Sequence, residues 1–170
     1  MINKLKIAYL AGIIDGEGSI SISDSRKTQK KMHFTTQLAV SSTDEVLLKW
    51  IVENFGGCYK TYTPKQLPQN ARKNVYKWQV SGDRLVPILN LVLPYLVIKT
   101  REAEVMIEMR STFGKDCKNY VTHKGASNPH PVLKEGILEK RLKCIAELKK
   151  LHCRNYNTYP GSHSFKRNRD

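Results

Sequence analysis

The chain has 170 residues and a formal net charge of +14 at pH 7, which favours a polyanion as its partner. A chain of this length can bury one hydrophobic core, and no stretch rich in proline, glycine or serine divides it, so we expect one domain with a C-terminal extension. It contains neither an apolar run long enough to cross a membrane nor the apolar core of a signal peptide, which excludes a membrane protein and predicts a soluble, intracellular one in a compartment that the sequence leaves open.

The first predicted element is a helix that begins near residue 4, ends at the glycines around Gly16 and is apolar on two sides. At 100° per residue, one face carries Ile7, Leu10, Ala11 and Ile14, and the nearly opposite face carries Leu5, Ala8, Gly12 and Gly16. Small residues at a spacing of four let two helix backbones approach closely. We therefore expect one face to pack on the core and the other to pack on a second helix.

Glu17 is expected just beyond the C-terminus of this helix, where the partial negative charge of the helix end disfavours a carboxylate. If the second helix belongs to another copy of the chain, two such carboxylates converge near the two-fold axis. A divalent cation is the simplest way to stabilise that pair. The helix thus predicts a homodimer with a cation site at Glu17.

Two predicted β-hairpins follow, and each includes a long stretch with basic residues and no acidic one. From Ser25 to Thr43 there are four basic residues and no acid, and from Asn54 to Gly82 there are five basic residues and no acid. The alternation of the strands directs Ile20, Ile22, Phe34, Thr36, Leu38, Val40, Tyr59, Tyr76, Trp78 and Val80 toward the core. The opposite face is therefore polar and free of negative charge.

Two-stranded ribbons with such a face fit the major groove of DNA, where Gln, Arg, Lys, Ser and Thr contact base edges or phosphates. The candidate DNA-binding residues are Ser19, Ser21, Ser23, Arg26, Lys27, Lys30, Lys31, His33, Thr35, Gln37, Lys60, Tyr62, Arg72, Lys73, Lys77 and Gln79. The alternative interpretation is a solvated sheet face with soluble hairpin tips.

Helices are predicted between and after the hairpins. Asp44 is a candidate N-cap for a helix that includes Val46 and ends at Gly56, and Asp83 precedes a second helix that Pro94 ends. A third helix is expected over about residues 100–113. The order predicts an α+β fold in which helices cover one side of an antiparallel sheet.

The C-terminal part is expected to cover the core. Residues 113–153 are predicted to form a helical extension of the same domain, with a helix from about Val132 to His152. The basic tail, residues 154–170, has two interpretations. Disorder in the free protein is favoured, and ordering on a phosphate backbone is the alternative.

The stretch from Leu10 to Gly18 resembles the signature of the LAGLIDADG homing endonucleases, with Leu10, Ala11, Gly12, Asp15 and Gly18 matching it. Without that resemblance, an ordinary amphipathic helix with a glycine cap would explain the same residues. The resemblance implies an αββαββα core, residues 1–112, whose antiparallel sheet forms a saddle across DNA. Since the chain carries a single copy of the signature, the resemblance also implies the homodimeric type.

The resemblance implies roles for individual residues as well. Glu17 and the Gly16 carbonyl bind Mg²⁺, which Mn²⁺ or Ca²⁺ can replace, and Lys99 approaches the scissile phosphate. Asp15 has a structural role in the helix pair, so the dimer interface comprises Leu5, Ala8, Gly12, Asp15 and Gly16. A lysine just before a helix N-terminus independently indicates a nearby anion, because the helix dipole disfavours a cation there.

Two positions depart from the family pattern. Many members carry Gln at the end of the second strand, where it orders an active-site water, and the matching residue here is Ser42. A basic residue that often follows one turn later falls near Val46, so its role is absent or is taken by another side chain, for which Lys77 is the candidate.

The sequence therefore predicts a metal-dependent endonuclease that cuts each strand of a long, pseudo-palindromic double-stranded DNA site as a homodimer. One alternative is a non-catalytic binder of the same fold, either a transcription regulator or a maturase that binds the RNA of its own intron. The other is a plain RNA-binding protein, for example a ribosomal one. RNA modules usually display aromatic residues on an exposed sheet, whereas most hairpin aromatics here are expected on the core face.

Overall fold

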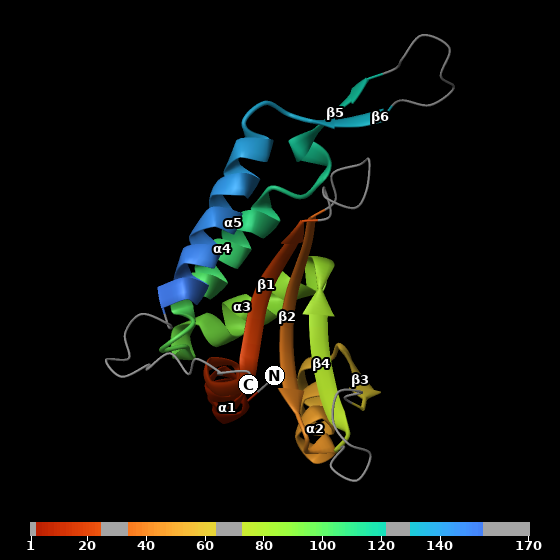
Figure 1. Ribbon diagram of the computed structural model, residues 1–170, viewed down its shortest axis with the longest axis vertical. Coiled ribbons are helices and arrows are strands. Elements are labelled where there is room, and N and C mark those ends of the chain that lie inside the picture. The colour runs from red at the N-terminus through yellow and green to blue at the C-terminus, as the bar shows by residue number, and fades with distance from the viewer. Residues whose placement is uncertain (1–2, 25–33, 64–72, 122–129, 155–170) are drawn as a thin grey trace, which may run out of the picture.

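The computed structural model describes residues 3–24, 34–63, 73–121 and 130–154, in which helices cover one face of a four-stranded antiparallel sheet (Figure 1). The elements are α1 (Lys4–Glu17), β1 (Gly18–Asp24), β2 (Phe34–Ser42), α2 (Glu45–Phe55), β3 (Cys58–Tyr62), β4 (Val75–Ser81), α3 (Leu85–Val92), α4 (Thr100–Ser111), β5 (Lys118–Val121), β6 (His130–Leu133) and α5 (Ile137–Arg154). The strand order in the sheet is β1-β2-β4-β3, with β5 and β6 forming a separate pair. The expected α+β core is confirmed.

Helix α1 packs on the sheet with the face that the sequence predicts. Ile7, Leu10, Ala11 and Ile14 are buried, and Asn3 caps the first turn by accepting a hydrogen bond from the Leu5 amide at 3.0 Å. The expected position of Glu17 was wrong by one residue, because the helix includes Glu17 and ends at Gly18. A Cβ at Gly18 would clash with the Ile14 carbonyl, so glycine allows the helix to pass directly into β1.

The predicted alternation of the strands is also confirmed. Ile20, Leu38, Val40 and Trp78 are completely buried beneath the helices. The register pairs Gly18 with Val40 across β1 and β2. Since side chains alternate along each strand, this register determines which polar residues share the opposite, open face of the sheet.

The helices after β2 differ from expectation in detail. Asp44 caps α2 by accepting from the Val46 amide at 2.8 Å, as predicted. Val46 itself is 74% exposed, and Leu48 occupies the core instead. Asp83 does not cap α3. It lies in a 3-10 turn, Gly82–Arg84, and accepts a hydrogen bond from Arg110 of α4 at 2.5 Å.

The C-terminal extension is not wholly helical. The expected helix from Val132 was wrong, since β6 extends to Leu133 and α5 begins at Ile137. Gly136, with φ of 75°, separates the strand from the helix, because few residues other than glycine adopt that backbone conformation. Figure 1 shows α5 beside α4 and β1, with β5 and β6 projecting at the end of the molecule away from α1. The tail beyond residue 154 lies outside the described residues.

A buried arginine fixes α5 to the core. Arg141 is 5% exposed, and its guanidinium donates to the Thr112 hydroxyl at 2.9 Å and to the Thr112 carbonyl at 2.5 Å. The same guanidinium stacks on the Phe113 ring, 4.2 Å from its centroid. Burial lowers the pKa of Arg141. No helix in the described parts of the chain is both long and apolar enough to cross a membrane.

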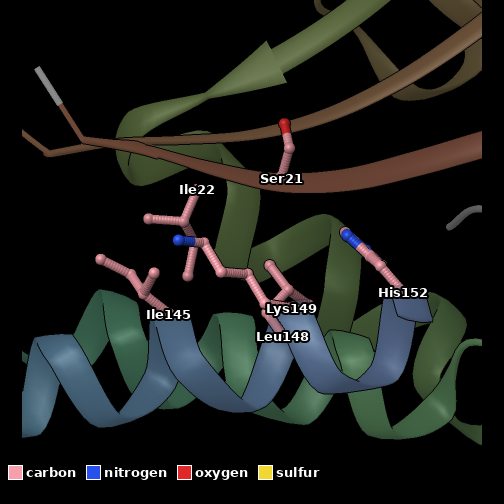
Figure 2. A pocket seen from close by; sticks show the side chains of 6 residues that line it. All are labelled: Ser21, Ile22, Ile145, Leu148, Lys149 and His152. Atoms are coloured by element: carbon pink, nitrogen blue, oxygen red, sulfur yellow. The ribbon is translucent and has the colours of Figure 1, made fainter. Parts of the chain in front are cut away.

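A small pocket of about 100 Å³ lies where α5 meets the edge strand β1 (Figure 2). Its walls are Ser21, Ile22, Ile145, Leu148, Lys149 and His152. In Figure 2 the Ile22 side chain points toward α5 and the Ser21 hydroxyl points to the other side of the strand. The view thus illustrates the alternation of β1, and the pocket, with three apolar and three polar lining residues, lies at the joint between the extension and the core.

Candidate active site and nucleic-acid interface

The end of α1 is joined to the segment before α4 by one carboxylate. Asp15 accepts hydrogen bonds from the Val97 amide at 2.7 Å and from the Lys99 amide at 2.9 Å. These contacts connect residues more than eighty positions apart in the sequence. Asp15 therefore has a structural role, as expected, but both of its carboxylate oxygens act within the chain.

Lys99 is the N-cap residue of α4, and its side chain returns to α1. Its Nζ donates to the Asp15 carbonyl at 2.5 Å. This carbonyl belongs to the last turn of α1, where the helix dipole is negative and favours a cation. The Lys99 ammonium is thus held at the carbonyl of Asp15, which is two residues before Glu17 in the sequence. The phosphate or carboxylate that the sequence predicts near Lys99 stays a prediction.

Glu17 and Gly16 present oxygen donors at the same helix end. Both residues are exposed, and the last bond of the helix runs from the Gly18 amide to the Ile14 carbonyl. The Gly16 carbonyl lies beyond that bond and has no intrahelical donor. A carboxylate and a backbone carbonyl are ligands that Mg²⁺ and Ca²⁺ favour. The donor chemistry therefore fits a hard divalent cation, although no group of three His, Cys, Asp or Glu side chains gathers at one point in the described residues.

Ser42 ends β2, as predicted, but its hydroxyl is already engaged. It accepts a hydrogen bond from the Asp44 amide at 3.0 Å and helps to form the start of α2. By alternation Ser42 shares the core side with Val40, whereas Ser41 lies on the open face opposite Lys77. The sequence placed Ser41 on this face but not among the candidate site residues, and the pairing of Gly18 with Val40 brings it next to the end of α1.

The open face of the sheet gathers the predicted DNA-binding residues that the structure describes. They are Ser19, Ser21, Ser23, Thr35, Gln37, Lys60, Tyr62, Lys77 and Gln79, which the strand pairing brings onto one side. Lys73 is exposed just before β4. Arg26, Lys27, Lys30, Lys31, His33 and Arg72 lie outside the described residues. Tyr62 is 49% exposed, while Tyr59, Tyr76 and Trp78 pack against the core.

Two glutamines on this face are bonded to each other. The Gln37 side-chain amide donates from Nε2 to Gln79 Oε1 at 2.9 Å. Gln37 pairs with Ser81 and Gln79 pairs with Ala39, so the glutamines are diagonal neighbours on β2 and β4. Long side chains can span such a diagonal. The sequence indicates a shared face for these residues but not this bond.

The face of α1 that points away from the core is open. Leu5 is 77% exposed, Gly12 and Gly16 are exposed, and a Cβ added at either glycine would meet no atom of the chain within 4 Å. Sequence reasoning missed Val97 and Ile98, which are 84% and 68% exposed in the segment that Asp15 holds. The apolar run Leu96-Val97-Ile98 directly before Lys99 was a readable signal, because only Leu96 of the three is buried in the single chain.

A comparison with protein families matches residues 10–97, a little over half of the chain, to the LAGLIDADG endonuclease model. The chain belongs to the LAGLIDADG endonuclease family. The match begins at the predicted signature and ends next to Lys99. No curated protein sequence matches the chain closely enough to identify a relative.

Solved structures of LAGLIDADG proteins share the fold. The homing endonuclease I-CvuI, in complex with its target in the presence of calcium, has a TM-score of 0.64 at 20% identity, over 87% of this chain and 82% of that one. The archaeal intron-encoded homing endonuclease I-Vdi141I, in complex with DNA, has a TM-score of 0.58 at 17% identity, over 95% and 89%. The homing endonuclease I-TnaI has a TM-score of 0.52 at 14% identity, over 86% and 92%.

Proposed function

We propose that this LAGLIDADG protein is a metal-dependent homing endonuclease that binds a long, pseudo-palindromic double-stranded DNA site as a homodimer and hydrolyses one phosphodiester bond in each strand. The observation that carries the proposal is the end of α1, where Glu17 lies beside the Asp15 and Lys99 junction. The complexes of I-CvuI with its target and of I-Vdi141I with DNA support the choice of substrate.

In this proposal Glu17 and the Gly16 carbonyl hold Mg²⁺, with Mn²⁺ or Ca²⁺ as alternative occupants. When bound, the cation lowers the pKa of a water and stabilises the leaving 3′ oxygen. Lys99 stabilises the negative charge that develops on the phosphate, and Asp15 keeps the Lys99 backbone at the end of α1. Ser42 stays a predicted catalytic residue, because its hydroxyl accepts a hydrogen bond from the Asp44 amide and can still donate one to a water.

The homodimer follows from the open face of α1. One chain supplies one Glu17, and cutting two strands requires two. A second copy that packs against Leu5, Ala8, Gly12 and Gly16 would cover this face and bring the two Glu17 carboxylates near the two-fold axis. Val97 and Ile98 extend the same apolar surface, so we include them in the proposed interface.

The open sheet face is the proposed DNA-binding surface. It combines lysines, glutamines and serines, and by the alternation of the strands it carries no acid, since Asp24 at the end of β1 shares the parity of Ile20 and Ile22. Tyr62 is the one hairpin aromatic with a largely exposed ring among the described residues, which argues against an RNA-stacking platform. A maturase or transcription regulator of the same fold would bind nucleic acid without cutting DNA.

The test is a cleavage assay on a duplex selected from a randomised library by binding to the protein. We expect cutting of both strands with Mg²⁺, none with a chelator, and none by Glu17→Gln, which should still bind. Glu53→Gln is the matched control, since Glu53 is an exposed acid on α2. Binding without cleavage by the wild type would favour a non-catalytic role, and full activity of Glu17→Gln would exclude it as the metal ligand.

A further inference from the structure

Two lysines lie directly opposite each other on the open sheet face. Lys60 of β3 pairs with Lys77 of β4 in the register of the sheet. Directly opposed residues have Cβ atoms about 4.5–5.5 Å apart, and like charges at that separation destabilise a sheet. Within the described residues neither lysine has a carboxylate partner. The register therefore places two lysines on neighbouring strands side by side, and no carboxylate of the described residues is bonded to either.

Protection of the sheet edge explains only one of these lysines. Strand β3 is an edge strand, and lysines on edge strands commonly prevent pairing with other chains. Strand β4 lies between β2 and β3, so Lys77 is not on an edge strand and this explanation does not apply to it. Its side chain is also half-buried, which makes an unpaired charge more costly than at the surface.

The pair lies level with the end of α1. Lys77 pairs with Ser41 on β2, and the preceding residue, Val40, pairs with Gly18 on β1. With neighbouring strands about 4.8 Å apart, the Lys77 backbone is roughly 10 Å from the line of β1 and the Lys60 backbone roughly 14 Å. A nucleic-acid strand that reaches Glu17 across this face would bring its neighbouring phosphates over Lys77 and Lys60.

We propose that Lys60 and Lys77 form a binding site for a backbone phosphate of DNA that neighbours the phosphate held at Glu17. This inference rests on the proposed function and adds a phosphate site to it. Two ammonium groups can donate to the two free oxygens of one phosphate, and its negative charge removes their mutual repulsion. The site therefore lowers the stability of the free sheet and contributes affinity without sequence preference.

These two effects have opposite signs, which makes the site testable. Lys60→Gln and Lys77→Gln should each raise the melting temperature of the free protein by roughly 1–3 °C at fixed protein concentration, because a repulsion is lost. Each should also make the dependence of duplex binding on salt shallower, with the slope of log affinity against log salt falling by about one.

Two controls accompany these variants. Lys77→Arg keeps the charge and should keep the salt slope of the wild type. Lys49→Gln removes a lysine of α2 that is paired with Glu45 at 3.1 Å on the helix side of the sheet, and it should leave the salt slope unchanged. Binding is measured with one duplex of fixed sequence between about 50 and 200 mM salt.

The outcomes separate this site from the proposed function. If the wild type binds the duplex and both glutamine variants keep its salt slope, the phosphate site is wrong and the proposed function survives. If Lys60→Gln causes self-association but leaves the salt slope unchanged, Lys60 prevents β3 from pairing with other chains and the proposed phosphate site is wrong. A lower melting temperature in Lys77→Gln would also overturn it, because the lysine would then stabilise the free sheet. A wild type that binds no duplex DNA overturns both proposals.

Discussion

The end of α1 and the open face of the sheet differ in whether their charged side chains have partners within the chain. At the end of α1, two hydrogen bonds of 2.9 and 2.5 Å join Asp15 to Lys99, and a third of 2.7 Å joins Asp15 to the Val97 amide. On the open sheet face, Lys60 and Lys77 face each other with no carboxylate between them in the described residues. The contact between Asp15 and Lys99 is formed within the chain, whereas the two lysines have no partner in the described residues.

This difference corresponds to two physical demands. A group that acts on a reacting phosphate must be held at a fixed position, since small displacements cost large factors in rate. A surface that meets a long polyanion gains affinity from unpaired cations, because binding then releases counterions from the DNA. Partners within the chain hold a catalytic group in position, whereas partners within the chain would reduce the affinity that a DNA-binding surface gains from its cations.

The largest expected effect concerns the open face of α1, which also lacks a partner in the single chain. Gly12→Val should abolish dimerisation and with it all cleavage. A Cβ added at Gly12 meets no atom within 4 Å and the residue is exposed, so we expect the monomer to fold. In a close helix pair each inserted side chain costs roughly 1–3 kcal/mol, and two-fold symmetry doubles that cost.

Analytical ultracentrifugation measures the assembly, and a thermal melt of the dilute protein controls for folding. The intermediate variant Gly12→Ala should weaken the dimer less while stabilising the helix by up to about 1 kcal/mol, since glycine is a poor helix former. A monomeric wild type, or an intact dimer in Gly12→Val, contradicts the proposed interface.

The second-largest expected effect tests the role of Lys99 at the end of α1. Lys99→Met should reduce the single-turnover cleavage rate by roughly 10²–10³-fold, as expected for the loss of one donor to a charged transition state. Duplex affinity should change little, because the ammonium is bound to the Asp15 carbonyl and not to the open sheet face. Lys115→Met, an exposed lysine beyond the other end of α4, is the matched control. Equal losses of affinity and rate would mean that Lys99 contributes to DNA binding and not to the chemical step.

Much of the fold could be predicted because its signals are local. The spacing of Ile7, Leu10 and Ile14 identifies the buried face of α1, and alternation in β1 and β2 identifies the core side of the sheet. The end of α1 was predicted to within two residues, since the helix was expected to end around Gly16 and its C-cap is Gly18. These features depend on the spacing of apolar residues within one short segment, which the sequence shows directly.

The contacts that build the site are not local. The bonds of Asp15 to Val97 and Lys99 depend on how distant helices pack, and the opposition of Lys60 and Lys77 depends on the register of β3 with β4. In the extension, apolar residues from Val132 onward resembled one helix, since a short apolar run does not distinguish strand from helix. Only Gly136 and the pairing with β5 separate them.

A third effect sharpens the comparison within the open sheet face. Gln37→Ala and Gln79→Ala should each relax sequence preference by roughly 1–3 kcal/mol at the base pair they read. Because the two amides are bonded at 2.9 Å, the double variant should lose less than the sum, by about 0.5 kcal/mol or more. Cleavage profiles over all single-base variants measure both terms, with Ser23→Ala combined with Gln79→Ala as the additive control. Additive losses in the glutamine pair would mean that each reads its base alone.

The smallest effect lies on the helix side of the same strands. The Glu45 carboxylate accepts from Lys49 at 3.1 Å and from the Tyr59 hydroxyl at 3.0 Å, and these bonds, that of Lys49 first, lower the pKa of Glu45. A carboxyl whose pKa is lower in the folded state stabilises the fold above its unfolded value of about 4.3, and this stabilisation is lost as the pH falls through the lowered pKa. Glu45→Gln should therefore be slightly less stable than the wild type at neutral pH and equal to it in acid.

Urea midpoints at about pH 7 and about pH 3 measure that difference. The salt slope of duplex binding should stay that of the wild type, because Glu45 and Tyr59 lie beneath the sheet while Lys60, next to Tyr59 in β3, faces the other side. A changed salt slope would mean that the helix side contributes to DNA binding. The DNA-binding surface would then not be limited to the open face of the sheet, and the contrast between this face and the internally paired end of α1 would not hold.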